Sequence, residues 1–304
     1  MLLVKIKSPI TGYDNVTLLK TFSTQKIVGD WQEFFGIDIN AELGSYPDFH
    51  LFQCNVTGLR FFYPLDIFGS AQLYEKLMKF EWYYMNDKWE YRIALQDLQN
   101  CGTALEIGCG HGHFVNQASK KGIQIEGIDS NDRAILEAQQ NGLNVHKGSV
   151  EELLAQKKNQ YDYLCSFQVL EHLPDPLEFL KNCTELLKLN GQLLLSVPNI
   201  NSFLKYQYNL LDMPPHHMTQ WSVYSFRALE NFLPLKLENA RFEPLADYHI
   251  SGYLQAKENQ FKEIVSRLPE PLVKSVINKC ESFLRKGLNK YTKGQSLYVK
   301  FRKK

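Results

Sequence analysis

The residues of this chain whose types and spacing suit chemistry begin with a glycine-rich run. Glu106 is followed by glycines at alternate positions, Gly108, Gly110 and Gly112, directly after an apolar stretch. Glycines at these positions let the backbone turn tightly and approach a ligand without a Cβ clash. The free N–H groups at the start of the following helix favour an anionic group, and Glu106 adds a carboxylate for a neighbouring ammonium. The run therefore suits an amino-acid head group, which carries both charges.

A dinucleotide is the main alternative ligand for this run. Its fingerprint needs a glycine three residues after Gly110, where this chain has His113. Asp129 ends the next apolar run, where an acid can accept hydrogen bonds from both ribose hydroxyls. Asp129 is also placed to cap the helix that follows, but beside the glycine-rich run we favour the ribose role. The glycine spacing disfavours a nicotinamide-dependent oxidoreductase.

Alternating strand-like and helix-like runs must position these residues. Strand-like runs lie at 103–107, 123–128, 143–146, 161–166 and 192–197, and helical runs lie at 114–121, 132–141, 150–157 and 176–188. Five strands with crossover helices predict an α/β fold with a doubly wound, Rossmann-like parallel sheet. Such sheets bind ligands beyond the carboxyl ends of their strands, so the residues after each strand are the candidates. A helix from about 223 to 233, a strand over 242–250 and a last strand over 297–301 are expected to follow.

Four segments in this order resemble the class I S-adenosylmethionine-dependent methyltransferases, over roughly residues 101–200 and more loosely to the C-terminus. They are the glycine-rich run, Asp129, the segment Glu171-His172-Leu173-Pro174-Asp175-Pro176 and the segment 187–199. The third is similar to a segment of small-molecule methyltransferases, ubiquinone-type O-methyltransferases among them. The resemblance implies a seven-stranded methyltransferase sheet, S-adenosyl-L-methionine as cofactor and a small-molecule acceptor.

The resemblance also implies which residues hold the cofactor. The glycine-rich motif would hold the methionine part, and Asp129 would hold the ribose. Ser149 stands where the family usually has an aspartate near the adenine, and its hydroxyl can still hydrogen-bond the adenine amine. The expected cofactor-binding residues are Tyr83, Glu106, Gly108, Cys109, Gly110, Gly112, Asp129, Ser130, Ser149, Val150, Phe167 and Gln168.

Histidines are the candidates for removing a proton from an acceptor hydroxyl, because histidine titrates near neutral pH. His172 follows the fourth strand, and His216 and His217 lie in a Pro-Pro-His-His segment similar to one in many bacterial methyltransferases of this type. Adjacent side chains in an extended loop point apart, so we expect one of this pair to face the site. The alternative is that one of them caps the next helix or bonds a loop carbonyl. We expect no metal, because these residues and Glu171 show no close helical pairing such as His-Glu-x-x-His.

Three domains are predicted: 1–66, a degenerate zinc-ribbon-like module; 67–100, a helical lid; and 101–304, the methyltransferase domain with a helical insertion at about 254–290. The first resembles the zinc ribbon of related bacterial enzymes in residues 8–12 and 54–59, but three of the four ligand sulfurs are missing, so we expect no zinc. We read 67–99 as helix, with most of its aromatic side chains in the core and one or two over a ligand. The insertion is expected to shape the acceptor pocket or a dimer contact.

Composition restricts the partners. The 34 basic and 33 acidic residues argue against nucleic-acid binding. No apolar run approaches the roughly 20 residues that span a bilayer, and no signal-peptide pattern is seen, so we expect a cytoplasmic monomer or homodimer without a membrane partner. Six cysteines without a Cys-x-x-Cys pair predict reduced thiols. The expected function is O-methylation of a sugar, lipid-precursor or quinone-like hydroxyl. The alternatives are a non-catalytic interaction protein that keeps the cofactor fold, and a protein methyltransferase.

Overall fold

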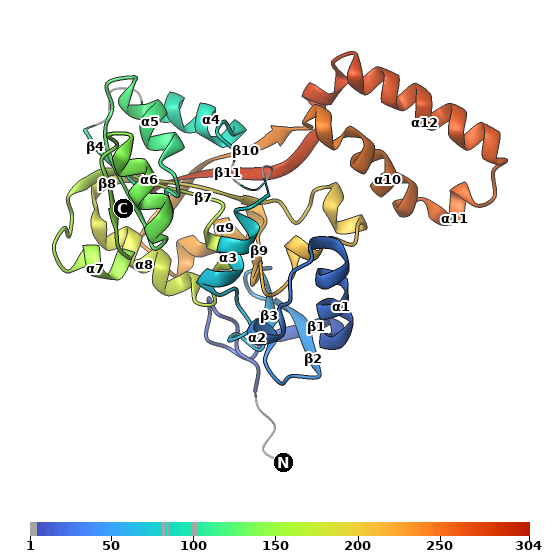
Figure 1. The fold of residues 1–304 in the computed structure, drawn as a ribbon, viewed down its shortest axis with the longest axis horizontal. Coiled ribbons are helices and arrows are strands. Elements are labelled where there is room, and N and C mark those ends of the chain that lie inside the picture. Colours follow the sequence, from blue (N-terminus) through green and yellow to red (C-terminus); the bar gives the residue numbers. More distant parts are fainter. Residues whose placement is uncertain (1–4, 81–82, 84, 99–101) are drawn as a thin grey trace.

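The computed structural model describes residues 5–80, 83, 85–98 and 102–304 (Figure 1). Trp82, Tyr84 and Cys101, which the sequence analysis considered, lie outside the described residues.

A mixed seven-stranded sheet forms the centre of the described structure, with strand order β10-β11-β8-β7-β4-β5-β6. β4 to β8 pair in parallel, whereas β11 is antiparallel to both β8 and β10. This order confirms the predicted α/β fold. The strands are β4 (Thr103–Ile107), β5 (Gln124–Asp129), β6 (Val145–Lys147), β7 (Tyr161–Phe167), β8 (Leu187–Pro198), β10 (Leu235–Pro244) and β11 (Lys293–Lys303).

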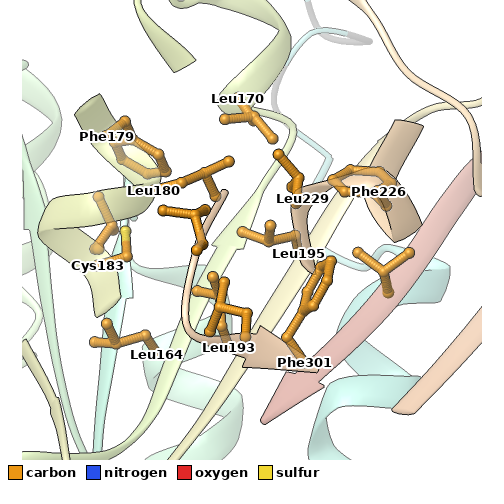
Figure 2. Close-up of a cluster of buried hydrophobic side chains, with 14 of the residues drawn as sticks. Leu164, Leu170, Phe179, Leu180, Cys183, Leu193, Leu195, Phe226, Leu229 and Phe301 are labelled. Carbon is orange, nitrogen blue, oxygen red and sulfur yellow. The ribbon is translucent and has the colours of Figure 1, made fainter. Parts of the chain in front are cut away.

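Helices cover both faces of this sheet because its strands carry apolar side chains at successive positions. In β8, Leu193 and Leu195 belong to one hydrophobic cluster and Leu194 belongs to another, as the alternation of side chains along a strand requires. Figure 2 shows the first cluster, in which Phe179 and Phe226 lie over the sheet. The first cluster is covered by α7 (Val150–Leu154), α8 (Pro176–Leu186) and α9 (Val223–Ala228), and the second by α4 (Trp89–Asp97), α5 (His113–Ser119) and α6 (Asp132–Gln140).

Residues 67–99 do not form the single helix that we expected. α3 (Ala71–Leu77) and α4 are separate, and the described residues between them are not helical. Leu73 and Leu77 of α3 pack into the core of the N-terminal module, whereas Ala94 and Leu95 of α4 pack on the large sheet. The break lets each short helix face a different core.

The N-terminal module is built on a second, antiparallel sheet with strand order β1-β2-β3-β9. Its strands are β1 (Val16–Ser23), β2 (Asp48–Cys54), β3 (Arg60–Tyr63) and β9 (Thr219–Gln220). The module also contains α1 (Thr24–Phe35) and α2 (Asn40–Leu43), which the sequence analysis did not predict. Thr11 Oγ1 and Cys54 Sγ lie 4.0 Å apart, so the two ribbon-like segments face each other. The resemblance to a zinc ribbon remains a prediction.

The C-terminal part differs from the prediction in the position of one strand. β10 begins at Leu235 and ends at Pro244, and the chain is helical from Asp247 to Gln260, so the strand expected over 242–250 was wrong beyond its first residues. The helices α10 (Ile250–Gln260), α11 (Lys262–Val265) and α12 (Glu270–Arg285) project from the sheet as an arm (Figure 1). None of the described helices is both long and apolar enough to cross a bilayer. Short 3₁₀ turns complete the structure: η1 (Leu170–His172), η2 (Phe203–Tyr206), η3 (Leu210–Asp212), η4 (Leu229–Asn231), η5 (Asp247–His249) and η6 (Leu288–Tyr291).

Candidate active site

A cavity of about 1580 Å³ opens at the carboxyl ends of β4, β5 and β7, where the fold predicts a ligand site. Almost all of the residues expected from the sequence line it. Glu106 and Gly112 are the two that do not line it, and they lie at the end of β4 and directly before α5.

The glycine-rich turn lies at the mouth of β4 and is tied to β5 by backbone hydrogen bonds. Gly108 N donates to Ile128 O at 2.8 Å, and Gly110 N donates to Asp129 Oδ2 at 2.8 Å. Gly108 has φ +77°, and a Cβ there would lie 2.4 Å from Cγ2 of Val169. A larger residue is therefore disfavoured both by the backbone conformation and by the space available.

Asp129 is held by the backbone on both of its oxygens. Asn131 N donates to Oδ1 at 2.8 Å, while Oδ2 accepts from Gly110. Each oxygen keeps a second lone pair that can accept a hydrogen bond from a ribose hydroxyl. The alternative that Asp129 caps α6 was wrong, because Asn131 is the cap and accepts from Ala134 N at 3.1 Å.

Glu106 is buried, and its Oε2 has no hydrogen-bond partner among the described residues. Burial raises the pKa of this carboxyl well above its ordinary value, and the charge of Lys88 opposes the shift. A buried carboxylate without a partner is unfavourable, so a cation that binds beside it would be stabilised. The amino group of an amino-acid head group held by the glycine-rich turn provides such a cation.

Several other expected cofactor residues have their side chains engaged within the protein. The Phe167 ring lies 4.9 Å from that of Phe114. The Gln168 amide donates to Glu90 Oε1 at 3.2 Å and to Ser196 Oγ at 3.3 Å. Both residues nevertheless line the cavity. A ligand there meets their backbone and the outer part of these side chains.

Ser149 and Cys109 also have structural contacts. Ser149 Oγ accepts from Glu152 N at 3.2 Å, in a capping box that begins α7. Its oxygen keeps one lone pair for an adenine amine. Cys109 is buried, and burial raises its pKa far above the ordinary value, so it stays a thiol.

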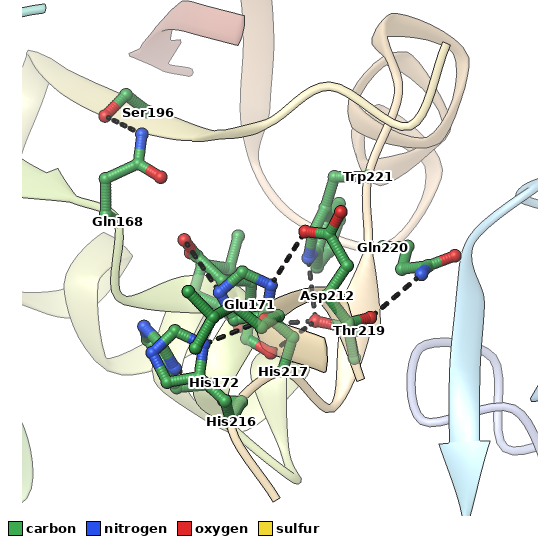
Figure 3. Close-up of polar contacts among 12 residues, drawn as sticks. Gln168, Glu171, His172, Ser196, Asp212, His216, His217, Thr219, Gln220 and Trp221 are labelled. Carbon is green, nitrogen blue, oxygen red and sulfur yellow. Dashed lines mark hydrogen bonds and ion pairs between the residues drawn. The ribbon is translucent and has the colours of Figure 1, made fainter. Parts of the chain in front are cut away.

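The three candidate histidines all line the cavity, and the structure brings them together (Figure 3). Nitrogen atoms of His172, His216 and His217 all lie within 4.8 Å of one another. The expectation that the adjacent pair would point apart was wrong, because the two rings are stacked with centroids 4.4 Å apart. The segment is a turn rather than an extended loop, since the N–H groups of both residues donate to Met213 O.

The partners of each ring differ. His172 Nδ1 lies 2.6 Å from His216 O, and so carries the proton and leaves Nε2 as an acceptor. His216 uses both nitrogens, with Nδ1 2.8 Å from Leu211 O and Nε2 3.0 Å from the Tyr83 hydroxyl. His216 therefore fulfils the alternative in which one histidine bonds a loop carbonyl. Tyr83, expected to contact the cofactor, contacts this ring.

Sequence reasoning considered Glu171 beside the histidines but missed Asp212 and Tyr74, which also surround the cluster. His217 Nδ1 lies 3.4 Å from Asp212 Oδ1, and its Nε2 lies 4.0 Å from Glu171 Oε1. The Tyr74 hydroxyl lies 3.3 Å from His172 Nδ1. Glu171 is the first residue of the motif at 171–176, but Asp212 and Tyr74 carry no sequence signal beyond their residue type.

Burial keeps the three histidine rings neutral near pH 7. It lowers the pKa of His172 to about 4 and the pKa values of His216 and His217 well below their ordinary value. Burial also raises the pKa of Glu171 to about 8 and that of Asp212 to about 6. Neither carboxylate oxygen of Glu171 has a hydrogen-bond partner among the described residues.

This donor set fits a divalent cation. Neutral imidazoles and a carboxylate are the ligands that zinc prefers alongside thiolate. Spacing along the sequence predicted no metal because it showed no helical pairing. The structure assembles the donors from two loops, so that spacing argument does not apply to this site.

Comparison with known proteins agrees with this geometry. The family described as a methyltransferase domain matches residues 82–234, half of the chain. A ubiquinone biosynthesis O-methyltransferase from Nitrosospira multiformis is 35% identical over 126 residues, which cover 37% of this chain and 53% of that protein. One from Coxiella burnetii is 30% identical over 140 residues, which cover 39% of this chain and 60% of that protein. The chain thus spans a little over half the length of these curated relatives.

A solved structure of an S-adenosylmethionine-dependent methyltransferase from Archaeoglobus fulgidus shares the fold, with a TM-score of 0.51 and 19% identity. The match covers 76% of this chain and 100% of that one. The chain belongs to the methyltransferase-domain family and has the class I fold whose cofactor is S-adenosylmethionine. The resemblance stated from the sequence is confirmed.

The low pKa of His172 predicts a pH-dependent stability. Between pH 6.5 and 4 the unfolded chain binds a proton at this residue and the folded chain does not, so the free energy of unfolding falls as the pH falls. The variant His172→Gln has no such titration. Between pH 6.5 and 4 its free energy of unfolding should therefore fall by about 3 kcal/mol less than that of the wild type. Urea unfolding of both proteins in EDTA measures the difference, in which the contribution of Glu171 cancels. Equal pH slopes for the two proteins would contradict the assignment.

Proposed function

We propose that this chain transfers a methyl group from S-adenosylmethionine to a hydroxyl of a small-molecule acceptor. Glu106 Oε2, buried without a hydrogen-bond partner among the described residues and close to the Gly108–Gly110 turn, carries this proposal. The ammonium group of a cofactor held by this turn would compensate for that burial, and the histidine cluster lines the same cavity. The cavity of about 1580 Å³ leaves room for an acceptor beside the cofactor.

The residues divide the work between binding and proton transfer. S-adenosylmethionine supplies a methyl group on a sulfonium, which leaves as a neutral thioether without a general acid. Glu106 binds the amino group, and Asp129 binds the ribose. Alignment of the acceptor by the cavity walls contributes several kcal/mol to lowering the barrier.

His172 is the residue that we assign to the acceptor proton. It is the least buried of the three histidines, it lines the cavity, and its Nδ1 faces the His216 carbonyl, so that Nε2 is the nitrogen without a proton. His216 has both nitrogens engaged, and His217 lies between Asp212 and Glu171. These two residues hold the cluster in place.

The acceptor class rests on the relatives. The names of the curated relatives describe O-methyltransferases of ubiquinone biosynthesis, which supports a hydroxyl on a quinone-like ring, with a sugar or a lipid precursor as further candidates. A cytoplasmic location and a monomer or homodimer belong to the same proposal. A non-catalytic role is disfavoured by the intact cofactor residues, whereas a protein acceptor remains the alternative.

A second role for the histidine cluster is supported by Glu171, whose carboxylate lacks a hydrogen-bond partner among the described residues. A divalent cation held by Glu171, His172 and His217 would lower the pKa of an acceptor hydroxyl bound to it. The acceptor hydroxyl would then release its proton to solvent, without a histidine as the base. The two roles make different predictions for chelated protein.

The first prediction concerns the cofactor. Purified protein should bind S-adenosylmethionine and not NADH in calorimetric titrations, and Asp129→Ala should weaken binding at least tenfold because the ribose loses its acceptor. Asp132→Ala, at the exposed start of α6, is the matched control and should bind as the wild type does. Folded wild-type protein that binds no S-adenosylmethionine would remove the basis of the proposal.

The second prediction concerns the base. Release of S-adenosylhomocysteine is measured with a panel of a catechol, a sugar and a long-chain alcohol. For whichever acceptor reacts, His172→Ala should lower kcat about 100-fold, as expected for loss of a general base, while cofactor affinity is unchanged. His50→Gln, on β2 outside the cavity, serves as control. An unchanged kcat in His172→Ala would remove this residue from the mechanism.

The third prediction concerns the metal. Protein dialysed against EDTA should take up one Zn²⁺ per chain on titration, and both Glu171→Gln and His217→Gln should weaken that binding at least tenfold. His50→Gln should bind as the wild type does. If chelated, folded wild-type protein binds no Zn²⁺, Mn²⁺ or Mg²⁺, the second role is excluded and His172 remains the direct proton acceptor.

A further inference from the structure

A second cavity, of about 400 Å³, lies between the N-terminal sheet and the loop that follows β8. We call it the module cavity. Phe22 and Lys20 on β1, and Phe62 and Arg60 on β3, line it because alternate residues of a strand share one face. Its walls therefore combine aromatic surface with positive charge.

The module cavity adjoins the candidate active site. The two cavities share a wall formed by Pro198, Leu204, Gln207, Asn209, Asp212 and His217. His217 is thus in contact with both spaces. A ligand that extends beyond the active site on this side meets the module.

The charge of the module cavity is not neutralised within the protein. Lys20, Arg60 and Lys205 line it, and none of them forms an ion pair with an acid in the described part of the chain. Asp212 is the one carboxylate on its walls, and the Asp212 oxygens face His217, at 3.4 Å, and the Asn209 amide, at 3.2 Å. The open side of the cavity is therefore positive.

Arg60 is the most constrained of these cations. It is half-buried, and its Nε donates to Gln53 Oε1 at 3.3 Å. The two terminal nitrogens of its guanidinium have no hydrogen-bond partner among the described residues. A half-buried fork of donors without an acceptor in the described part of the chain matches the paired oxygens of a phosphate or a carboxylate.

The apolar lining indicates what is attached to that anion. Leu19, Leu51 and Leu204 join Phe22 and Phe62 around the charged groups. An inorganic ion would leave this surface wet, whereas an organic anion would cover it.

We propose that the module cavity binds the anionic end of the acceptor, a phosphate or carboxylate on an apolar stem, with Arg60 as its principal ligand. This inference rests on the proposed function for the other end of the same molecule. It gives the N-terminal module a role in choosing the acceptor.

Four probes separate the two features of such a ligand. Octyl phosphate and octanoate carry both an anion and a stem, inorganic phosphate carries the anion alone, and 1-octanol carries the stem alone. In calorimetric titrations without cofactor, at least one of the first two should bind at least tenfold more tightly than either of the last two. Binding of inorganic phosphate as tight as that of octyl phosphate would make the site one for a free ion and would overturn the proposal.

Variants of Arg60 test the assignment. Arg60→Met should weaken binding of the anionic probe about tenfold, as expected for a lost charged hydrogen bond, and should leave 1-octanol binding and S-adenosylmethionine binding unchanged. Arg60→Lys keeps the charge and loses the fork of donors, so its affinity for the anionic probe should lie between those of the wild type and Arg60→Met. This variant also covers the case in which Arg60→Met does not fold. Arg267→Met, between α11 and α12 on the projecting arm, is the matched control.

The outcomes distinguish this inference from the proposed function. Equal binding of the anionic probe by the wild type and the Arg60 variants, in protein that binds S-adenosylmethionine, would overturn the inference alone. Failure of the wild type to bind S-adenosylmethionine would overturn the proposed function. Arg60-dependent binding of an anionic amphiphile would then still establish a ligand site, but would remove its connection to an acceptor.

Discussion

Carboxylate oxygens buried without a hydrogen-bond partner are the constraint on which this site depends. Glu106 lies one residue before the end of β4, and Glu171 follows the neighbouring strand β7, so the crossover topology places both at one edge of the sheet. Oxygens of both are unpartnered among the described residues. Their burial is unfavourable for folding unless protons or ligands compensate for it. The fold thus holds two positions where a positive group is favoured, at the carboxyl ends of neighbouring strands.

The segment 213–221 connects that cavity to the N-terminal module. Met218 N donates to Glu171 O at 2.8 Å, and Phe62 N donates to Met218 O at 2.9 Å. Thr219 pairs with Phe61 as part of β9. The histidine turn therefore lies between the loop after β7 and the module sheet. This continuity of backbone hydrogen bonds explains how a module without catalytic residues can fix the position of His217.

The sequence predicts a ribbon-like module, and the structure shows which side chains stabilise it. Ser8, Thr11 and Cys54 lie where ribbon-like segments meet, and hydroxyls cannot replace thiolates around zinc. The stabilisation comes from buried aromatic side chains such as Trp31, Phe49 and Phe62. The cavity on its face is then available for ligand contacts.

The sequence determined the parallel strands of the sheet and the family, and it predicted the residues that we propose for the cofactor, because all of these depend on short segments. The run from Glu106 to Gly112 and Asp129 is local, and each strand and its crossover helix can be read from periodicity. Helix α1, the break between α3 and α4, and the start of β10 were not predicted, since each depends on which core the segment joins. The histidine cluster depends on long-range contacts as well. Only the tertiary structure decided that His172, His216 and His217 meet, that Asp212 and Tyr74 join them, and that Arg60 faces a cavity, because those residues approach one another across different elements and no spacing along the chain records it.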